Sequence, residues 1–500
     1  MEALSCIVVG QGGLPIQCLG ILADAGFIIR AVVSSDRAVR EECAGRGWRT
    51  MPLSGIDWNN LAAEVAECDF LFSIVNFSIL PDSVVSAPKK LAINFHDAPL
   101  PRYGGMNAAF WALWNGETEH GVTWHVMTAD VDGGDILEQA RVPIGPDDTS
   151  FVLNLKCSFA AIQTFRSLVE KLRRGEPRRL PQDPSRRSYF EPYARPPAAG
   201  LLDFTEPARI IARHVRAFSF GSHENRMGVA RIVLGGKAVV VQKVVVTDES
   251  RNVVPGTVVR SDNRSLCIAT SEGSLLATDI FDGFGRPIPD GWIPDAVRMR
   301  SDVQPSRESL DWLTAADQGW VRNERFWKKR IVDASFLELP PSMGGAESES
   351  RIEGAISVSP LTFLQQCLDH WSIRLGKERF EWGLVRRDLP AAQGDWTGLI
   401  SDAVPASYVR GKALADGTWS LIEKRGFFLR DVGMRYPDVP SDSPIRGNPW
   451  PILVHWGAAG DRPCGSARVC LTIDFDRPAF TFSSSVHSID DLRGWLPYQA

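Results

Sequence analysis

The sequence has few of the features that mark a disulfide-bonded, metal-binding or membrane protein. Its nine cysteines are scattered, and no two of them form a CxxC pair. We interpret them as small buried side chains in a reducing compartment. No apolar run reaches the roughly 18 residues that a membrane helix needs. The opening MEALSCIVVGQGG lacks the basic and apolar regions of a signal peptide. These absences predict a cytoplasmic protein.

Basic residues are also not in excess. The chain has 55 Lys and Arg against 60 Asp and Glu, a formal net charge of −5. This balance argues against a nucleic acid as the main partner, because proteins that bind polyanions usually have a basic surface. The apolar share of 44% and the charged share of 23% are ordinary for a globular protein, and 500 residues suggest about three domains.

The first 190 residues alternate between short apolar runs and helical patterns. A β-branched run over 6–9 meets a glycine-rich turn, a helix is expected over 16–25, and a second strand over 28–34. This order predicts an α/β fold of Rossmann type with a parallel sheet. Pro15 stands where a dinucleotide fingerprint has its third glycine. We therefore interpret the glycines as a tight turn that contacts part of a substrate or nothing at all.

Polar side chains gather at the ends of two further expected strands. The apolar run 91–93 leads to Asn94 and His96, and a strand expected over 122–127 leads to a loop that carries Asp132. An amide and an imidazole can both donate to an oxygen that gains negative charge. A carboxylate can orient the imidazole and accept a proton. Because no Ser or Cys stands in a nucleophile turn, direct attack by a substrate is more natural than a covalent intermediate.

His125 lies close in sequence to Asp132 and Asp135, so these three could in principle hold a cation. Nothing else in the sequence completes a coordination shell. We therefore predict no metal site.

A set of ordered motifs resembles the formyltransferases that use 10-formyltetrahydrofolate, such as methionyl-tRNA formyltransferase. The motifs are Asn94-Phe95-His96, Pro99-Leu100-Pro101-Arg102-Tyr103-Gly104-Gly105, Gly121-Val122-Thr123 and Asp130-Val131-Asp132-Gly133-Gly134-Asp135-Ile136-Leu137. The likeness covers residues 4–300. It implies that Asn94, His96 and Asp132 are catalytic and that 10-formyltetrahydrofolate is the formyl donor. The chain departs from the family by placing Asp97 directly after the catalytic histidine.

The resemblance also implies where the folate lies. In the family, the end of the strand expected over 70–75 and the loop after it border the pteridine ring. A flat heteroaromatic ring needs an apolar slot with polar groups at its edge. The folate-binding residues expected on this basis are Ile74, Phe77, Ile79, Leu80, Asp130 and Val131. The alternative is that the first four form an ordinary buried strand and turn.

The middle of the chain contains a long helix, a connector and a β-rich region. Apolar spacing predicts a helix over 150–172 that ends at Gly175. The Pro- and Arg-rich residues 173–200 predict an extended connector, whose arginines are solvated or contact an anionic part of the acceptor. Residues 201–300 combine a helix with short strands and predict a small OB-like β-barrel. This region resembles the formyltransferase C-terminal subdomain, which helps to hold nucleic acid in the tRNA-specific members.

Residues 305–500 predict an α+β region that begins with an amphipathic helix over 309–331. The segments 336–341 and 424–437 resemble parts of nonribosomal peptide synthetase condensation-type domains, and 340–354 reads as a linker. The His-His-x-x-x-Asp-Gly motif of condensation domains is absent. We therefore expect a condensation-like or docking region without catalysis. The predicted domains are a formyltransferase catalytic domain (1–190), its β-barrel subdomain (201–300) and this region (305–500).

Together these features predict an enzyme of one-carbon metabolism that transfers a formyl group to a primary amine. The expected acceptor is an aminoacyl group in nonribosomal peptide biosynthesis, free or tethered to a peptidyl carrier protein. The alternatives are an amino-sugar nucleotide or other small amine, a hydrolase that releases formate, and a non-catalytic folate-fold docking protein. Folate and the amine are the expected small-molecule partners; neither a membrane nor tRNA is expected.

Overall fold

The computed structural model describes residues 3–234, 237–249, 253–262, 265–289, 306–337, 340, 350–386, 403–414, 431–457, 467–475 and 477–497. The chain forms two compact units. Unit 1 comprises Met1–Ala194 with Arg216–Gly221, and unit 2 comprises Arg195–Val215 with Ser222–Ala500. Among the described residues, no helix has both the length and the apolar character to cross a membrane.

A seven-stranded sheet organises unit 1. Its strand order is β3-β2-β1-β4-β5-β7-β8. The first five strands in this order run parallel, whereas β7 runs antiparallel to β5 and β8 antiparallel to β7. The predicted α/β class is confirmed, and the sheet is mixed at one edge. The strands are β1 (Ser5–Gly10), β2 (Ile28–Ser34), β3 (Thr50–Pro52), β4 (Phe70–Ile74), β5 (Leu91–His96), β7 (Glu119–Val126) and β8 (Ile136–Pro143).

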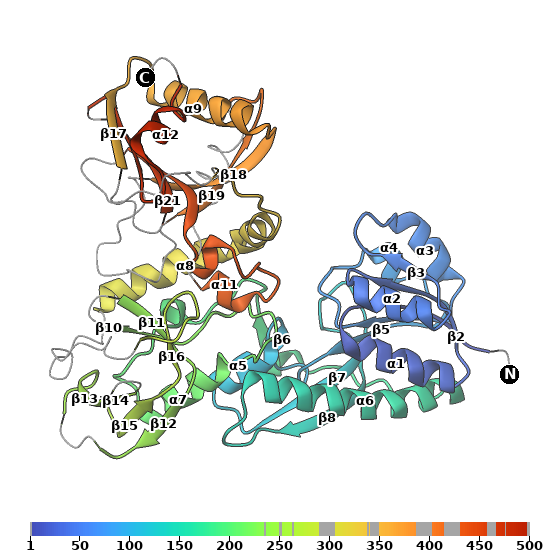
Figure 1. Ribbon diagram of the computed structural model, residues 1–500. Helices are drawn as coiled ribbons and strands as arrows, with labels where there is room; N and C mark the ends of the chain where they lie inside the picture. Colours follow the sequence, from blue (N-terminus) through green and yellow to red (C-terminus); the bar gives the residue numbers. More distant parts are fainter. Residues whose placement is uncertain are drawn as a thin grey trace. The chain divides into compact units, whose positions relative to one another are not determined.

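Helices cover both faces of this sheet. Successive strand residues point to opposite faces. Leu71 belongs to a core cluster with Leu61 of α3, while Phe72 meets Phe165 of α6 edge to face at 5.5 Å. Helices α1 and α6 pack side by side along the sheet (Figure 1). The helices of unit 1 are α1 (Gly13–Asp24), α2 (Arg37–Gly45), α3 (Trp58–Ala66), α4 (Asp82–Val85), α5 (Ala108–Trp114) and α6 (Ser150–Arg174).

The glycine-rich turn after β1 serves close packing. A Cβ on Gly10 would lie 2.1 Å from the carbonyl oxygen of Ile74, at the end of the neighbouring β4. Gly12, the N-cap of α1, has a φ of 72°, which glycine adopts without strain. Gly10 is therefore explained by the close approach of β4, and Gly12 by the tight turn that the sequence predicts.

The long helix α6 ends as its sequence predicts, but the connector after it does not run as a free extended chain. Gly175 caps α6 in the left-handed conformation, with a φ of 73°. The connector then forms the short strand β9 (Tyr189–Phe190), which pairs in parallel with β6 (Gly104–Gly105). The connector thus returns to the loop that follows β5.

The first part of unit 2 holds α7 (Ala208–Ala217) up to Val215, and two small antiparallel sheets. Their strand orders are β10-β11-β16 and β12-β15-β14-β13. Residues 242–243 separate β11 from β12, which lets the two strands join different sheets. The strands are β10 (Arg231–Leu234), β11 (Lys237–Val241), β12 (Val244–Thr247), β13 (Val258–Ser261), β14 (Leu266–Ala269), β15 (Ser274–Ala277) and β16 (Ile280–Phe281).

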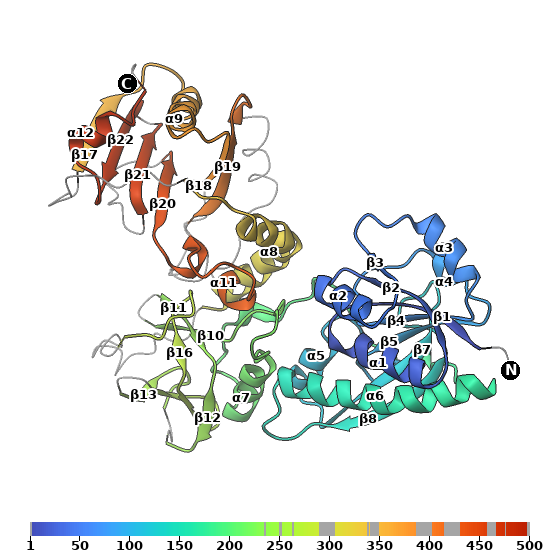
Figure 2. The same cartoon turned by 45° about the vertical axis from the view of Figure 1, so that its right-hand side comes forward.

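The rest of unit 2 is α+β. Figure 2 shows a six-stranded sheet of order β17-β22-β21-β20-β18-β19. Trp371 of α9 and Trp382 of β18 are buried in its core. The elements are α8 (Arg307–Val332), α9 (Pro360–Leu375), α11 (Val432–Arg435), α12 (Ile489–Arg493), β17 (Ser350–Ala355), β18 (Arg379–Arg386), β19 (Val404–Val409), β20 (Trp450–Trp456), β21 (Ala467–Asp474) and β22 (Ala479–Ser484).

One prediction for this region is wrong, and others fall outside the described residues. The expected linker 340–354 ends in β17, because residues 350–355 pair with β22 along their whole length. Residues 341–349 of that linker, and 424–430 of the segment that resembles synthetase domains, lie outside the described part of the chain.

A buried group of charges lies inside unit 2. Arg231 of β10 pairs with Asp431, which also forms an ion pair with Arg435 of α11, 2.9 Å from its Nε. Arg435 and Arg195 both pair with Glu324 of α8. Burial alone would raise the pKa of Asp431, but Arg231 and Arg435 hold it below its ordinary value. Ion pairs between side chains this deeply buried tie β10 to α8 and α11.

Removing one charge from this group is expected to destabilise the protein strongly. Asp431→Ala leaves Arg231 buried without its carboxylate and Arg435 with Glu324 alone, which costs about 3–5 kcal/mol of the free energy of unfolding. Chemical denaturation of the whole chain measures this loss. The control is Asp438→Ala, which removes a half-exposed partner of Lys328 and should cost at most about 1 kcal/mol. Equal losses for the two variants would contradict the assignment.

Candidate active site

The end of β5 and the neighbouring β7 bring polar side chains to one face of the sheet. Asn94 and His96 are two residues apart on β5 and therefore share a face. His125 of β7 lies directly opposite Asn94 in the register, so it shares that face as well. Phe95 points to the other face and packs against Trp124, with ring centroids 5.0 Å apart. The register of β5 and β7 thus places Asn94, His96 and His125 on the same face of the sheet.

The amide of Asn94 is held by His125. The Nδ2 of Asn94 lies 3.1 Å from the Nε2 of His125, and the Nδ1 of that ring lies 3.0 Å from the carbonyl oxygen of Val126. Because a carbonyl only accepts, Nδ1 carries the proton of the neutral ring, and Nε2 accepts from the amide. This leaves the second N–H of Asn94 available to another acceptor. Asn94 itself is half-buried.

The tautomer of His96 follows from a similar contact. Its Nε2 donates to the carbonyl oxygen of Tyr103 at 2.8 Å, so the proton of the neutral ring is on Nε2. The bare Nδ1 faces the carboxylate of Asp132, 3.8 Å from Oδ2. The nitrogen available for proton transfer is therefore Nδ1.

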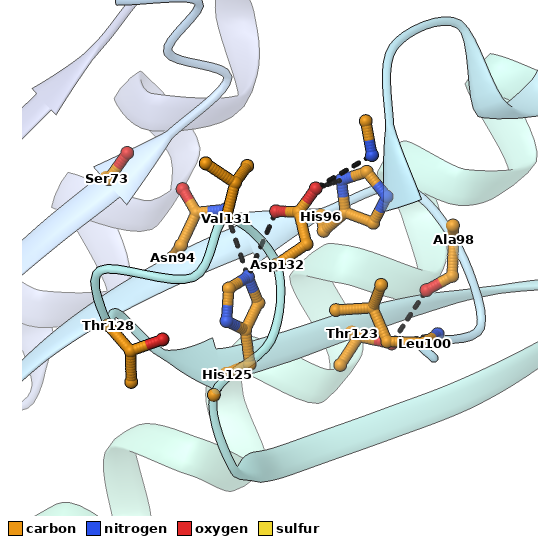
Figure 3. Close-up of polar contacts among 12 residues, drawn as sticks. Ser73, Asn94, His96, Ala98, Leu100, Thr123, His125, Thr128, Val131 and Asp132 are labelled. Carbon is orange, nitrogen blue, oxygen red and sulfur yellow. Dashed lines mark hydrogen bonds and ion pairs between the residues drawn. The ribbon is translucent and has the colours of Figure 1, made fainter. Parts of the chain in front are cut away.

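Asp132 lies on the loop after β7 and joins these groups (Figure 3). Its Oδ2 accepts from the amide of Gly105 at 2.8 Å, and its Oδ1 lies 3.5 Å from the Nε2 of His125. Its side chain is 10% exposed. Burial alone would raise the pKa of this carboxyl, but the positive charge that His96 can carry and the hydrogen bond from the Gly105 amide hold it well below the ordinary value. Asp132 is therefore a carboxylate at neutral pH.

The low pKa of Asp132 predicts a loss of stability in acid. An aspartate in an unfolded chain has a pKa of about 4. Ionised Asp132 therefore stabilises the folded state above about pH 4, and this contribution is lost as the pH falls through the lower folded-state pKa. We expect the Tm difference between wild type and Asp132→Asn to be constant between about pH 5 and 7 and to shrink toward about pH 3. A calorimetric difference that widens below pH 4 would contradict the shift.

The residues expected to bind folate do not share one surface. Ile74 and Leu80 are buried, and Leu80 belongs to a core cluster with α3 and α4. Phe77 and Ile79 lie on the loop after β4 with 57% and 84% of their surface exposed. The loop thus carries two apolar side chains outside the core.

The other two expected folate residues lie on the loop that carries Asp132. Val131 is 45% exposed. Asp130 is paired with Arg187, which contacts both of its carboxylate oxygens. Asp130 and Val131 thus directly precede Asp132 on its loop, and the charge of Asp130 is paired with that of Arg187.

Asp97, which follows His96, contacts a different histidine. Its carbonyl oxygen accepts from the Nε2 of His120 at 2.7 Å. Burial lowers the pKa of His120. His120 is thus a neutral, buried ring that supports the backbone after β5.

Sequence reasoning missed two parts of the site. It considered His125 only as a metal ligand, although the structure places it against Asn94 and Asp132. It also missed the carbonyl of Tyr103, which fixes the tautomer of His96. The sequence feature that could have identified His125 is its position as a polar residue within the strand predicted over 122–127. No sequence signal marks a backbone carbonyl.

Comparison with protein families finds two matches. Residues 59–169 match the model described as formyl transferase, and residues 196–287 match the formyl transferase C-terminal domain. The first match contains Asn94, His96, His125 and Asp132. The second contains the two small sheets of unit 2.

Several solved structures are similar to parts of the chain. One is an N-formyltransferase from Helicobacter canadensis in complex with folinic acid and dTDP-3-aminofucose, at 18% identity, with 56% of this chain and 100% of that chain covered and a TM-score of 0.45. Another is HypX from Aquifex aeolicus in complex with tetrahydrofolic acid, at 17% identity, 56% and 44% coverage and a TM-score of 0.39. A third is a 4-N formyltransferase from Francisella tularensis, at 18% identity, 46% and 91% coverage and a TM-score of 0.39.

The family matches agree with the site, because the residues that converge at the end of β5 lie inside the first match. The chain therefore contains regions that match both formyl transferase domain models, and these matches support an enzyme of the formyltransferase type.

Proposed function

We propose that this enzyme transfers a formyl group from 10-formyltetrahydrofolate to a primary amine, with Asn94, His96 and Asp132 as its catalytic residues. The observation that carries the proposal is the convergence of these side chains, from β5 and from the loop after β7, within a chain that matches both formyl transferase domains. The exposed Phe77 and Ile79 support a folate donor, because they leave apolar surface on the loop after β4 that a flat ring would cover.

The reaction begins when the amine nitrogen attacks the formyl carbon. A new C–N bond forms, and the carbonyl oxygen becomes an oxyanion. The free N–H of Asn94 donates to this oxygen. Neutral His96 accepts the proton of the amine at Nδ1, and the resulting imidazolium lies beside the carboxylate of Asp132 and stabilises the oxyanion as well.

The intermediate then collapses. The carbonyl re-forms, and the bond between the formyl carbon and N10 of the folate breaks. The proton held at His96 passes to N10, directly or through Asp132 and water, so that the products are tetrahydrofolate and the N-formyl amine. The low pKa of Asp132 fits its role as the counter-charge of the imidazolium, because the carboxylate is ionised when the amine attacks.

The acceptor proposed is an aminoacyl group in nonribosomal peptide biosynthesis, free or tethered to a peptidyl carrier protein. Its support is the sequence likeness of 336–341 and 424–437 to synthetase segments. An amino-sugar nucleotide is the second candidate, since the Helicobacter structure at 18% identity was solved with dTDP-3-aminofucose. One experiment that offers both acceptors to the enzyme distinguishes between these two candidates.

The test incubates the full-length enzyme with 10-formyltetrahydrofolate and, separately, an aminoacyl carrier protein, a free aminoacyl thioester and a dTDP-amino sugar. Mass spectrometry detects the added formyl group. We expect a formylated aminoacyl product. Formylation of the sugar alone would replace the proposed acceptor by the second candidate. Release of formate without any N-formyl product would overturn the transferase proposal in favour of a hydrolase.

A further inference from the structure

The connector between the two family matches returns to the loop of Asp132. Residues 180–190, here called the strap, lie after the first match and before the second. The strap begins at Leu180, which exchanges two backbone hydrogen bonds with Ile136, and ends in β9. Composition predicted that this connector would be extended and that its arginines would be solvated or contact an anionic part of the acceptor, yet it carries specific contacts within the protein.

Gln182 holds the backbone on both sides of Gly133. Its Nε2 donates to the carbonyl oxygens of Asp132 and Gly134, each at 2.7 Å. One amide nitrogen thus uses both of its hydrogens on the loop that carries the catalytic carboxylate. The amide group of glutamine has two N–H donors for these two carbonyl oxygens. The carboxylate of a glutamate has the same shape but no hydrogen to donate.

Arg187 holds the residues just before Asp132. Its guanidinium contacts both carboxylate oxygens of Asp130 and donates to the carbonyl oxygen of Val131 at 2.9 Å. The Asp130 side chain is 65% exposed, so solvent weakens the ion pair itself. The contact with the Val131 carbonyl holds the backbone just before Asp132.

The loop needs such support because its conformation is unfavourable. Asp132 has a φ of 56°, in the left-handed region that residues other than glycine rarely adopt. A Cβ on Gly134 would lie 1.9 Å from the carbonyl oxygen of Val126, so the loop also passes very close to the end of β7. Backbone of this kind persists where surrounding contacts determine it.

The strap also holds the group that binds the carboxylate from the other side. The amide of Gly104 donates to the carbonyl oxygen of Ser188 at 2.9 Å, and the amide of Tyr103 donates to the hydroxyl of Ser188 at 2.8 Å. The next amide, of Gly105, is the one that donates to Asp132. Tyr103 is also the residue whose carbonyl accepts from His96. One short segment therefore fixes both sides of the contact between His96 and Asp132.

We infer that the strap aligns the catalytic carboxylate with His96 and that Gln182 is a positioning residue for Asp132. The expected effect of Gln182 on turnover rests on the proposed function. The expected effect of Gln182 on the loop of Asp132 does not depend on it. Gln182 touches neither His96 nor a reacting atom; it acts through the backbone of Asp132.

The kinetic test compares Gln182→Glu, Gln182→Leu and Gln163→Leu. Glu keeps the shape of the side chain but has no hydrogen to donate, so both strap variants should lower kcat by about 10- to 100-fold, with KM for the folate nearly unchanged. Gln163 is exposed on α6, and its variant should behave as wild type. Wild-type kcat in Gln182→Glu, or a loss confined to Gln182→Leu, would overturn the role of hydrogen-bond donation.

Hydrogen exchange separates this inference from the proposed function, since it needs no substrate. The amide of Gly133 donates to the carbonyl oxygen of Asp130 at 3.0 Å within the loop. In both strap variants this amide should exchange at least about tenfold faster than in wild type, and it should be unchanged in Gln163→Leu. If wild type transfers no formyl group, this measurement still tests the strap. Unchanged exchange in both strap variants would overturn it.

Discussion

Replacing Asp132 by asparagine is expected to lower kcat by about 10²- to 10⁴-fold while the protein stays folded. Asparagine has the shape of aspartate and can still accept from the amide of Gly105, so the loop keeps its contact. It carries no negative charge opposite the Nδ1 of His96, and it cannot hold a proton. The imidazolium that forms when the amine attacks therefore loses its counter-charge.

Steady-state kinetics with a saturating amine acceptor measure this effect, and circular dichroism checks the fold. The control is Asp135→Asn, in the same loop, whose carboxylate pairs with Arg179 at the surface. We expect this control to change kcat by less than about threefold, because a surface ion pair contributes about 1 kcal/mol or less. Comparable losses in the two variants would mean that loop charge in general matters, and not the carboxylate beside His96.

Asn94→Ala is expected to lower kcat by about 10²- to 10³-fold, the usual effect of removing one oxyanion donor. The variant loses the N–H that points away from His125, and it leaves the Nε2 of His125 without its donor. Asn94→Asp tests the same point differently, because it keeps the shape and removes both hydrogens. Both should reduce kcat more than they raise KM, since the donor acts on charge that develops in the transition state.

The control for this pair is Asn60→Ala, at an exposed position on α3, which should leave kcat unchanged. Near-wild-type kcat in Asn94→Asp would contradict the role of Asn94 as a donor. A rise in KM with unchanged kcat would instead assign Asn94 to substrate binding.

Local patterns predicted much of the fold because they report on single elements. The helix expected over 150–172 is α6, and its end at Gly175 follows from glycine adopting the left-handed cap. The helix expected over 309–331 is α8, within two residues at its start. Strand β17 was missed because its partner β22 lies far along the chain and residues 350–355 look like linker.

The candidate site was predicted in part for a related reason. Asn94, His96 and Asp132 were identified through ordered motifs, and the structure brings them together. His125 was not assigned to them, because its place depends on the antiparallel register of β5 and β7. The connector's arginines, Arg187 among them, were predicted to be solvated or to contact the acceptor, because no pattern relates Arg187 to Asp130, which lies 57 residues earlier. Strand register and the packing of a connector against an earlier loop depend on tertiary structure. The local spacing of residues in the sequence therefore does not predict them.

The most direct test of the central claim follows the formyl carbon itself. A single turnover of the full-length enzyme with 10-formyltetrahydrofolate labelled by ¹³C in the formyl group, and with the acceptor amine, is read by NMR for wild type, Asn94→Ala and Asp132→Asn. We predict that wild type moves the label into an N-formyl product as tetrahydrofolate appears in equal amount, and that both variants slow this step by about 10²-fold or more. Label appearing as formate, or moving at the wild-type rate in either variant, would contradict the account.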